Sequence, residues 1–206
     1  MKNIWITSDT HYGHKNICRG TTEWRLPDGS VPTHNTRPFS TVEAMNASIV
    51  ANINNVVKAD HTLIFLGDWS FGGFDNIQKF YDGLVCKNIV FIYGNHDHHI
   101  LNNKNNIQSL FVSVDHYKSM EINKIRLNLM HYPISSWDGL DRGVIHLHGH
   151  MHFVGENRFG KGRRMDVGMD GHPEFRPYNL VDEVIPMMLD RPIISEFTSD
   201  HHLDGL

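Results

Sequence analysis

Short apolar runs alternate with amphipathic segments through the first half of the chain. Three of these runs end abruptly in glycine or polar residues, as buried strands do: residues 3–7, 61–66 and 88–93. Behind a capping box formed by Ser40 and Glu43, apolar side chains recur at helical spacing and predict a helix over 41–58. A second helical pattern covers 75–84. The order strand, helix, strand, helix, strand indicates a layered α/β fold.

The second half of the chain has strand candidates that follow one another without a long helix between them. They are residues 111–114, 117–122, 125–130, 144–148 and 165–167. This succession favours a meander or a second sheet. A further helix is predicted over 180–189, although Pro186 weakens it. Glycines and prolines interrupt residues 20–39, which we expect to form an irregular lip facing the substrate.

Length and composition narrow the class of protein. A chain of 206 residues fits one domain, which we place over 1–190, with a tail of unknown role over 191–206. A net charge of -4 argues against a broad nucleic-acid-binding surface, although it leaves room for a local basic groove. Two cysteines, a start unlike a signal peptide and apolar runs shorter than about 18 residues predict a cytoplasmic protein without a membrane partner. Oligomeric state is not readable from these features.

Metal-ligand residue types gather where the predicted strands end. They are Asp9 and His11, then Asp68, then Asn95, His96 and Asp97, then His131, and last His150 and His152. Each alone has an ordinary explanation as a turn or cap residue. Together they indicate a common site, because loops at the carboxyl ends of strands converge in α/β folds. Oxygen and imidazole donors suit Zn, Mn and Fe, and a bridging carboxylate can hold two ions about 3.5–4 Å apart.

In this order, the five blocks resemble the calcineurin-like metallophosphoesterase superfamily, with its Asp-x-His, Gly-Asp, Gly-Asn-His-Asp/Glu, lone His and Gly-His-x-His pattern. The resemblance is closer to the small bacterial and phage phosphoesterases, through residues 9–17, 37–39, 146–152 and 166–168. It implies an α/β fold in which two stacked mixed β-sheets are flanked by helices, as a four-layer α/β/β/α sandwich. It also implies metal-dependent hydrolysis of a phosphate mono- or diester, by in-line attack of a metal-bridging hydroxide.

The resemblance also implies a role for each matching residue. The first metal would be held by Asp9, His11 and His152, and the second by Asn95, His131 and His150. Asp68 would bridge both ions, and His96 would stabilise the transition state or protonate the leaving oxygen. The two divalent ions would be Mn, Fe, Zn or Ni, with manganese favoured. The expected substrate is a phosphorylated small molecule or a nucleotide.

Three further side chains are candidates for contacts with substrate or with the ligands. His14 follows the first ligand block by three residues, and Arg37 could grip a phosphate with its guanidinium. His148 precedes the last block. For each of these, a structural role is the alternative: a surface or helix-start histidine, an arginine that anchors the loop, or a hydrogen-bonded core histidine.

Two other functions remain open at this point. One is a metal-dependent nuclease acting on single strands or ends, with nucleic acid as a less favoured partner. The other is a catalytically retired scaffold that binds proteins. A serine/threonine protein phosphatase is disfavoured, because Gly67–Asp68 runs into Trp69 rather than into the x-x-Asp-Arg-Gly of that branch.

Overall fold

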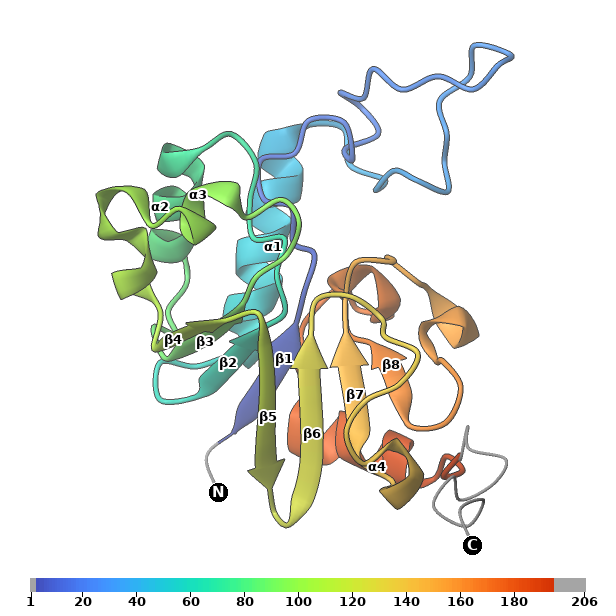
Figure 1. Ribbon diagram of the computed structural model, residues 1–206. Coiled ribbons are helices and arrows are strands. Elements are labelled where there is room, and N and C mark those ends of the chain that lie inside the picture. The colour runs from blue at the N-terminus through green and yellow to red at the C-terminus, as the bar shows by residue number, and fades with distance from the viewer. Residues whose placement is uncertain (1–2, 195–206) are drawn as a thin grey trace, which may run out of the picture.

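Two mixed β-sheets face each other at the centre of the molecule (Figure 1), in a computed structural model that describes residues 3–194. The first sheet has the order β4-β3-β2-β1-β9, and its strands are β1 (Ile4–Thr7), β2 (Thr62–Phe65), β3 (Ile89–Ile92), β4 (Ser113–Asp115) and β9 (Tyr178–Asn179). Strands β1 to β4 are parallel, and β9 runs antiparallel to β1.

The second sheet has the order β5-β6-β7-β8. Its strands are β5 (Tyr117–Ile122), β6 (Ile125–Met130), β7 (Ile145–His148) and β8 (Arg164–Asp166). The first two form an antiparallel hairpin, whereas β6, β7 and β8 are parallel. The strand candidates between residues 117 and 167 therefore form a second sheet and not a meander.

Helices cover the outer face of the first sheet (Figure 1). They are α1 (Val42–Val56), α2 (Phe74–Gly83) and α3 (His98–Leu101), followed by a 3-10 helix, η1 (Lys104–Leu110). The side chain that caps α1 belongs to Thr41, whose hydroxyl accepts from the amide of Ala44 at 3.1 Å. The predicted cap at Ser40 was therefore one residue too early, a common error because neighbouring hydroxyl residues give the same signal.

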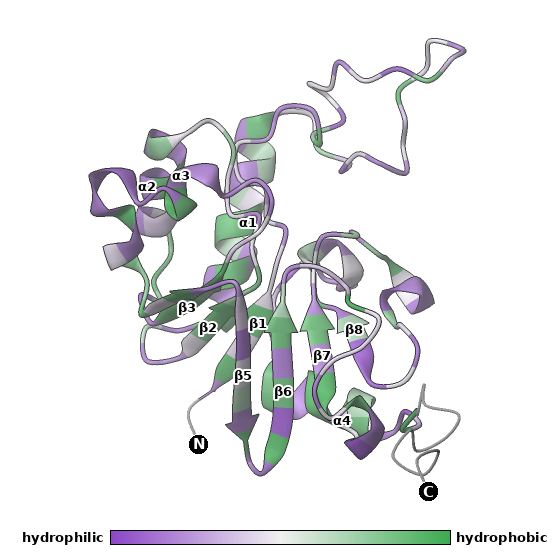
Figure 2. Cartoon of the chain, in the orientation of Figure 1, coloured by the Kyte–Doolittle hydropathy of each residue, from purple (hydrophilic) through white to green (hydrophobic). Residues whose placement is uncertain are grey.

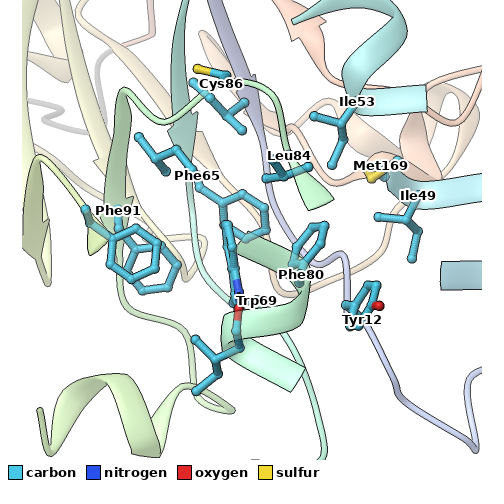
Figure 3. Packing of buried hydrophobic residues seen from close by; sticks show 14 of the residues in the cluster. Tyr12, Ile49, Ile53, Phe65, Trp69, Phe80, Leu84, Cys86, Phe91 and Met169 are labelled. Atoms are coloured by element: carbon cyan, nitrogen blue, oxygen red, sulfur yellow. Dashed lines mark hydrogen bonds between the residues drawn. The ribbon is translucent and has the colours of Figure 1, made fainter. Parts of the chain in front are cut away.

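Alternate residues of the first sheet divide the core in two. Leu63, Phe65 and Phe91 pack in one cluster with residues of α1 and α2. Figure 3 shows Phe65 and Phe91 of this cluster beside Trp69 and Phe80. The opposite face of β2, including Ile64, packs against the second sheet and α4 (Ile185–Leu189). Figure 2 shows the resulting hydrophobic stripes along the strands. Each sheet is thus fixed in register, because a one-residue slip would turn these side chains outward.

The outer face of the second sheet is covered by the segment that joins β6 to β7. Asn128, His146 and Arg164 lie side by side on this face. His146 Nε2 accepts from the amide of Ile134 at 3.3 Å, and its ring lies 5.2 Å from that of Trp137. His146 is therefore a structural histidine that fastens this covering segment, which contains the short η2 (Leu140–Arg142).

The predicted fold is confirmed, with three differences in detail. The strand predicted at 111–114 is β4, which joins the first sheet beside β3. The helix predicted over 180–189 is divided: a π turn, η5 (Leu180–Val184), precedes α4, because Pro186 fits only the first turn of an α-helix. Strand β9 has two residues, too few for any periodic signal.

The remaining short elements are η3 (Gly155–Arg158) and η4 (Met169–Gly171). Most of the predicted tail, residues 195–206, lies outside the described residues, and the domain boundary at 190 stays a prediction. Arg191 still contacts the body, since its guanidinium donates to the carbonyls of Gly160 and Gly162. Within residues 3–194, no helix has the length and apolarity needed to cross a bilayer.

Candidate metal centre

Loops that follow five strands bring the predicted ligands together at one edge of the sandwich. Five of these ligands have left-handed backbones, with φ of 56° at Asp9, 49° at His11, 58° at Asp68, 73° at His150 and 52° at His152. Such conformations are costly for residues other than glycine and cluster at functional sites. Gly94 and Gly149 lie against Asp68 and Asp9, where a Cβ would collide with the carboxylates.

Asp9, His11 and His152 form the first cluster. The Nε2 atoms of His11 and His152 lie 2.9 Å apart, and Asp9 Oδ1 is 3.8 Å from the first and 3.7 Å from the second. The other oxygen of Asp9 accepts from the Ser8 hydroxyl and from the amide of His150. One oxygen therefore fixes the carboxylate, and the other points at the two imidazoles.

Asn95, His131 and His150 form the second cluster. Asn95 Oδ1 is 3.0 Å from His131 Nε2 and 2.9 Å from His150 Nδ1. Asp68 lies between the two clusters, since its Oδ2 is 3.6 Å from the Nε2 atoms of both His11 and His131. The seven side chains predicted as metal ligands thus face one common space.

Hydrogen bonds to the far sides of two imidazoles prepare them to bind a cation. His131 Nδ1 is 2.7 Å from the carbonyl oxygen of Leu66, and His152 Nδ1 is 2.7 Å from Asp170 Oδ2. Because both partners only accept, each neutral ring carries its proton on Nδ1 and directs the Nε2 lone pair at the site. Two ligands held at about 2.1 Å and at a right angle lie about 3 Å apart, which matches the spacing of His11 and His152 in the first cluster and of Asn95 to its two histidines in the second.

The buried carboxylates also favour a cation. Asp9 Oδ1 is buried and has no hydrogen-bond partner among the described residues. Burial, together with the charge of Asp9, raises the pKa of Asp68, whereas the neighbouring His131 lowers it. Burial and the charge of Asp9 raise the pKa of Asp166 to about 7. A divalent ion would offset this repulsion, so the residues present fit the metals that the sequence pattern implies.

Asp97 holds two of the ligand loops together. Its carboxylate accepts from the backbone amides of Asp68, Trp69 and Gly94, at 2.8, 2.9 and 2.7 Å. Burial and the nearby charge of Asp68 raise its pKa to about 6. Asp97 therefore ties the loop after β2 to the loop after β3.

Arg37 is buried, and four hydrogen bonds hold its guanidinium. Its Nε and Nη2 donate to the two oxygens of Asp170 at 2.8 Å each, and its Nη1 and Nη2 donate to the carbonyls of Thr10 and Asp9 at 2.6 Å. This geometry fits the anchoring alternative for Arg37, because four of its five N–H donors are already used inside the protein. The guanidinium holds the pKa of Asp170 well below its usual range, although burial opposes this.

Asp170 escaped the sequence analysis. Its carboxylate accepts hydrogen bonds from both Arg37 and His152. The bond to His152, together with the charge of Asp9, raises the pKa of His152, although burial lowers it. The residue sits in a Met-Asp-Gly turn, η4, that reads as an ordinary turn in the sequence. Its only sequence signal is its position just after the Asp166-Val-Gly168 block.

His96 and His14 lie beside the clusters rather than within them. The side chain of His96 is 41% exposed, and its Nε2 is 4.0 Å from Asp68 Oδ2. Its backbone amide donates to the other oxygen of Asp68 at 2.9 Å. The ring of His14 packs on Phe71, at 3.8 Å between centroids, and stands edge-on to His11.

His148 is the last residue of β7 in the second sheet. Its Nδ1 is 2.9 Å from the carbonyl oxygen of Gly149, and its ring lies 5.4 Å from that of His146. Burial lowers its pKa to about 3. These contacts fit the alternative of a neutral core histidine.

Comparisons with known proteins find relatives that match most of the chain. The chain is 30% identical over 172 residues to an uncharacterized protein of Methanocaldococcus jannaschii, which covers 82% of this chain and 81% of that one. It is 24% identical over 211 residues to the gene 66 protein of a Mycobacterium phage, covering 90% and 96% of the two chains.

Among solved structures, a protein of unknown function from Aquifex aeolicus has the same fold, with a TM-score of 0.60 and 20% identity over 86% of this chain and 95% of that one. The family model of the calcineurin-like phosphoesterases matches residues 2–183, which include every residue of both ligand clusters. The chain belongs to the calcineurin-like phosphoesterase family.

Proposed function

We propose that this protein is a dinuclear metal-dependent phosphoesterase that hydrolyses a phosphate mono- or diester of a small molecule or nucleotide. The position of Asp68 is the observation that carries the proposal. Its Oδ2 lies 3.6 Å from an imidazole nitrogen of each cluster, as expected of a carboxylate shared by two ions. Asp9, His11 and His152 would hold one ion, and Asn95, His131 and His150 the other.

The two ions would neutralise the charge of the phosphate and lower the pKa of a bound water. Manganese is the proposed metal, because it fits this mixed set of oxygen and nitrogen donors. The protein supplies the positions of their ligands. Asp97 and the Arg37–Asp170 pair fix the loops and the ring of His152, so that the charges are in place before the substrate arrives.

His96 is the proposed general acid or transition-state stabiliser. Its ring lies beside the bridging carboxylate, yet it is exposed enough to meet a substrate. It is held between the rings of Phe71 and His11, at 4.6 and 5.5 Å between centroids. A histidine in this position can donate a proton to the leaving oxygen.

His14 is the proposed neutral donor to a phosphate oxygen. Its Nδ1 accepts from the amides of Asn16 and Ile17, at 3.1 and 3.2 Å, so the proton must be on Nε2. Burial and the nearby charge of His96 lower its pKa to about 4, which keeps the ring uncharged. The ring can therefore donate one hydrogen bond without repelling the cations.

A panel of esters tests the proposal. The protein is depleted of metal with a chelator and then assayed with Mn²⁺, Fe²⁺, Zn²⁺ or Ni²⁺ on p-nitrophenyl phosphate, bis-p-nitrophenyl phosphate and a single-stranded oligonucleotide. We expect no turnover without metal and hydrolysis of a small ester with at least one ion. Cleavage of the oligonucleotide alone would favour the nuclease alternative. Absence of turnover with every ion, in protein that binds two ions, would refute the proposal.

A further inference from the structure

A cavity of about 770 Å³ lies next to the metal centre. It opens between three parts of the chain: the predicted lip, helix α1 and residues 151–175. The lip extends from the body of the molecule as the long loop of Figure 1. Cavities of this volume accommodate small organic ligands. Nothing in the ligand clusters requires a space of this size, so the cavity needs its own explanation.

Aromatic rings line the cavity. Phe39 from the lip and Phe175 from the loop before β9 face each other at 5.8 Å between centroids. Trp24, Met151 and Val154 stand around them with 40%, 43% and 56% of their surface exposed. Flat apolar surfaces that remain open to solvent are typical of sites that stack planar rings.

The backbone of Phe175 is strained to keep its ring in this position. Its φ is 49°, a left-handed conformation that bulky residues rarely adopt. The strained residue is held from both sides, by the side-chain amide of Asn52, which donates to its carbonyl at 2.9 Å, and by its own amide, which donates to His172. Strain of this kind is retained where a side chain serves a function.

The cavity carries no free charge that would bind a second phosphate. Arg37 and Asp170 are the only acidic or strongly basic side chains among its lining residues, and they neutralise each other. Apart from the histidines His34, His152 and His172, the remaining polar groups, such as those of Ser48 and Asn52, are uncharged. The occupant is therefore expected to be neutral apart from the phosphate at the metal centre.

The cavity and the metal centre share a wall. His152 and Asp170 line the cavity, and His152 also points its Nε2 at Asp9. At the rim, Trp24 stands edge-on to His14 at 6.0 Å between centroids. A molecule whose phosphate meets the ligand clusters can therefore extend directly into the cavity.

We propose that this cavity receives the organic group of the phosphoester, and that this group is an uncharged planar ring system of nucleoside size stacked on Trp24 and Phe175. The proposal rests on the proposed function, because that function places the phosphate at the metal centre.

Binding of a nucleoside tests the cavity separately from catalysis. Thymidine and ribose are titrated into the full chain, with binding followed by NMR. We expect thymidine to bind and ribose not to bind detectably. Trp24→Ala should weaken thymidine binding about tenfold, because stacking on one aromatic ring commonly contributes that much. The control is Leu189→Ala on α4, since Leu189 is also 40% exposed and does not line the cavity.

Kinetics then connect the cavity to the ester. The substrates are thymidine 5′-(p-nitrophenyl phosphate) and methyl p-nitrophenyl phosphate for a diesterase, or thymidine 5′-phosphate and ribose 5-phosphate for a monoesterase. We expect kcat/KM to favour the thymidine compound, and the ratio of the two values to fall about tenfold in Trp24→Ala but not in Leu189→Ala.

Each other outcome is decisive. Equal kcat/KM for both esters, with no preference for thymidine in binding, would overturn the cavity assignment and leave the proposed function intact. Trp24-dependent thymidine binding without hydrolysis of any ester would support the cavity and overturn the proposed function. A loss of binding in Leu189→Ala equal to that in Trp24→Ala would overturn the assignment to this cavity.

Discussion

Replacing Asp170 by asparagine tests how the centre is held. The carboxylate meets Arg37 Nε and Nη2 and His152 Nδ1, all within 2.8 Å. An amide puts a donor in place of one oxygen, so at least one of these three contacts becomes unfavourable. Arg37, which is 4% exposed, also loses the carboxylate that neutralises it.

The expected magnitudes follow from these contacts. Removing one partner of a buried ion pair costs about 3–5 kcal/mol, and we take about 3 kcal/mol because Arg37 keeps its bonds to two backbone carbonyls. For a chain of this length, that cost lowers Tm by about 6–12 °C. Loss of the bond that orients His152 should weaken metal binding about 10- to 100-fold.

Two measurements and one control separate these effects. Thermal denaturation of metal-depleted Asp170→Asn gives the stability, and calorimetric titration with Mn²⁺ gives the affinity. Asp138→Asn is the control, because Asp138 also pairs with two arginines, Arg126 and Arg142, but is 61% exposed. It should change stability by less than about 1 kcal/mol and leave metal binding unchanged. An Asp170→Asn protein that binds Mn²⁺ within about twofold of the wild type would refute the role given to Asp170.

Three further substitutions probe the centre itself. Asp68→Ala should abolish turnover and remove at least one bound ion, as measured by metal analysis, and full activity in that variant would contradict the bridging role. His96→Ala should retain both ions and the wild-type Tm but lower kcat about 100-fold or more, as expected for a lost proton donor; loss of an ion would show that His96 is a ligand instead. His14→Phe preserves the packing on Phe71 but removes both ring nitrogens, the Nδ1 that accepts from the amides of Asn16 and Ile17 and the Nε2 donor, so kcat/KM should fall about tenfold with unchanged metal content. Unchanged kcat/KM would remove His14 from the site.

The strands and the ligand blocks were readable from the sequence because their signals are local. An apolar run that stops at Gly67–Asp68 or at Gly94–Asn95 identifies both a buried strand and the polar loop that follows it. Strand β9 and the π turn before α4 were not predicted, since each spans too few residues to show a period. The assignment of β4 to the first sheet also needed the structure, because pairing is not encoded within a single strand.

The sequence by itself determined which residue types stand at the strand ends and in what order. This indicated a metal site, and its resemblance to the calcineurin-like family implied a metal-dependent phosphoesterase. Only the tertiary structure decided how those residues are held. Arg37 and Asp170 are 133 positions apart, and Asp97 reaches amides 28 and 29 positions away. Such contacts depend on the paths of irregular loops, which have no periodicity to read. The cavity beside His152 arises in the same way, because the lip, helix α1 and residues 151–175 form it jointly and none of them predicts it alone.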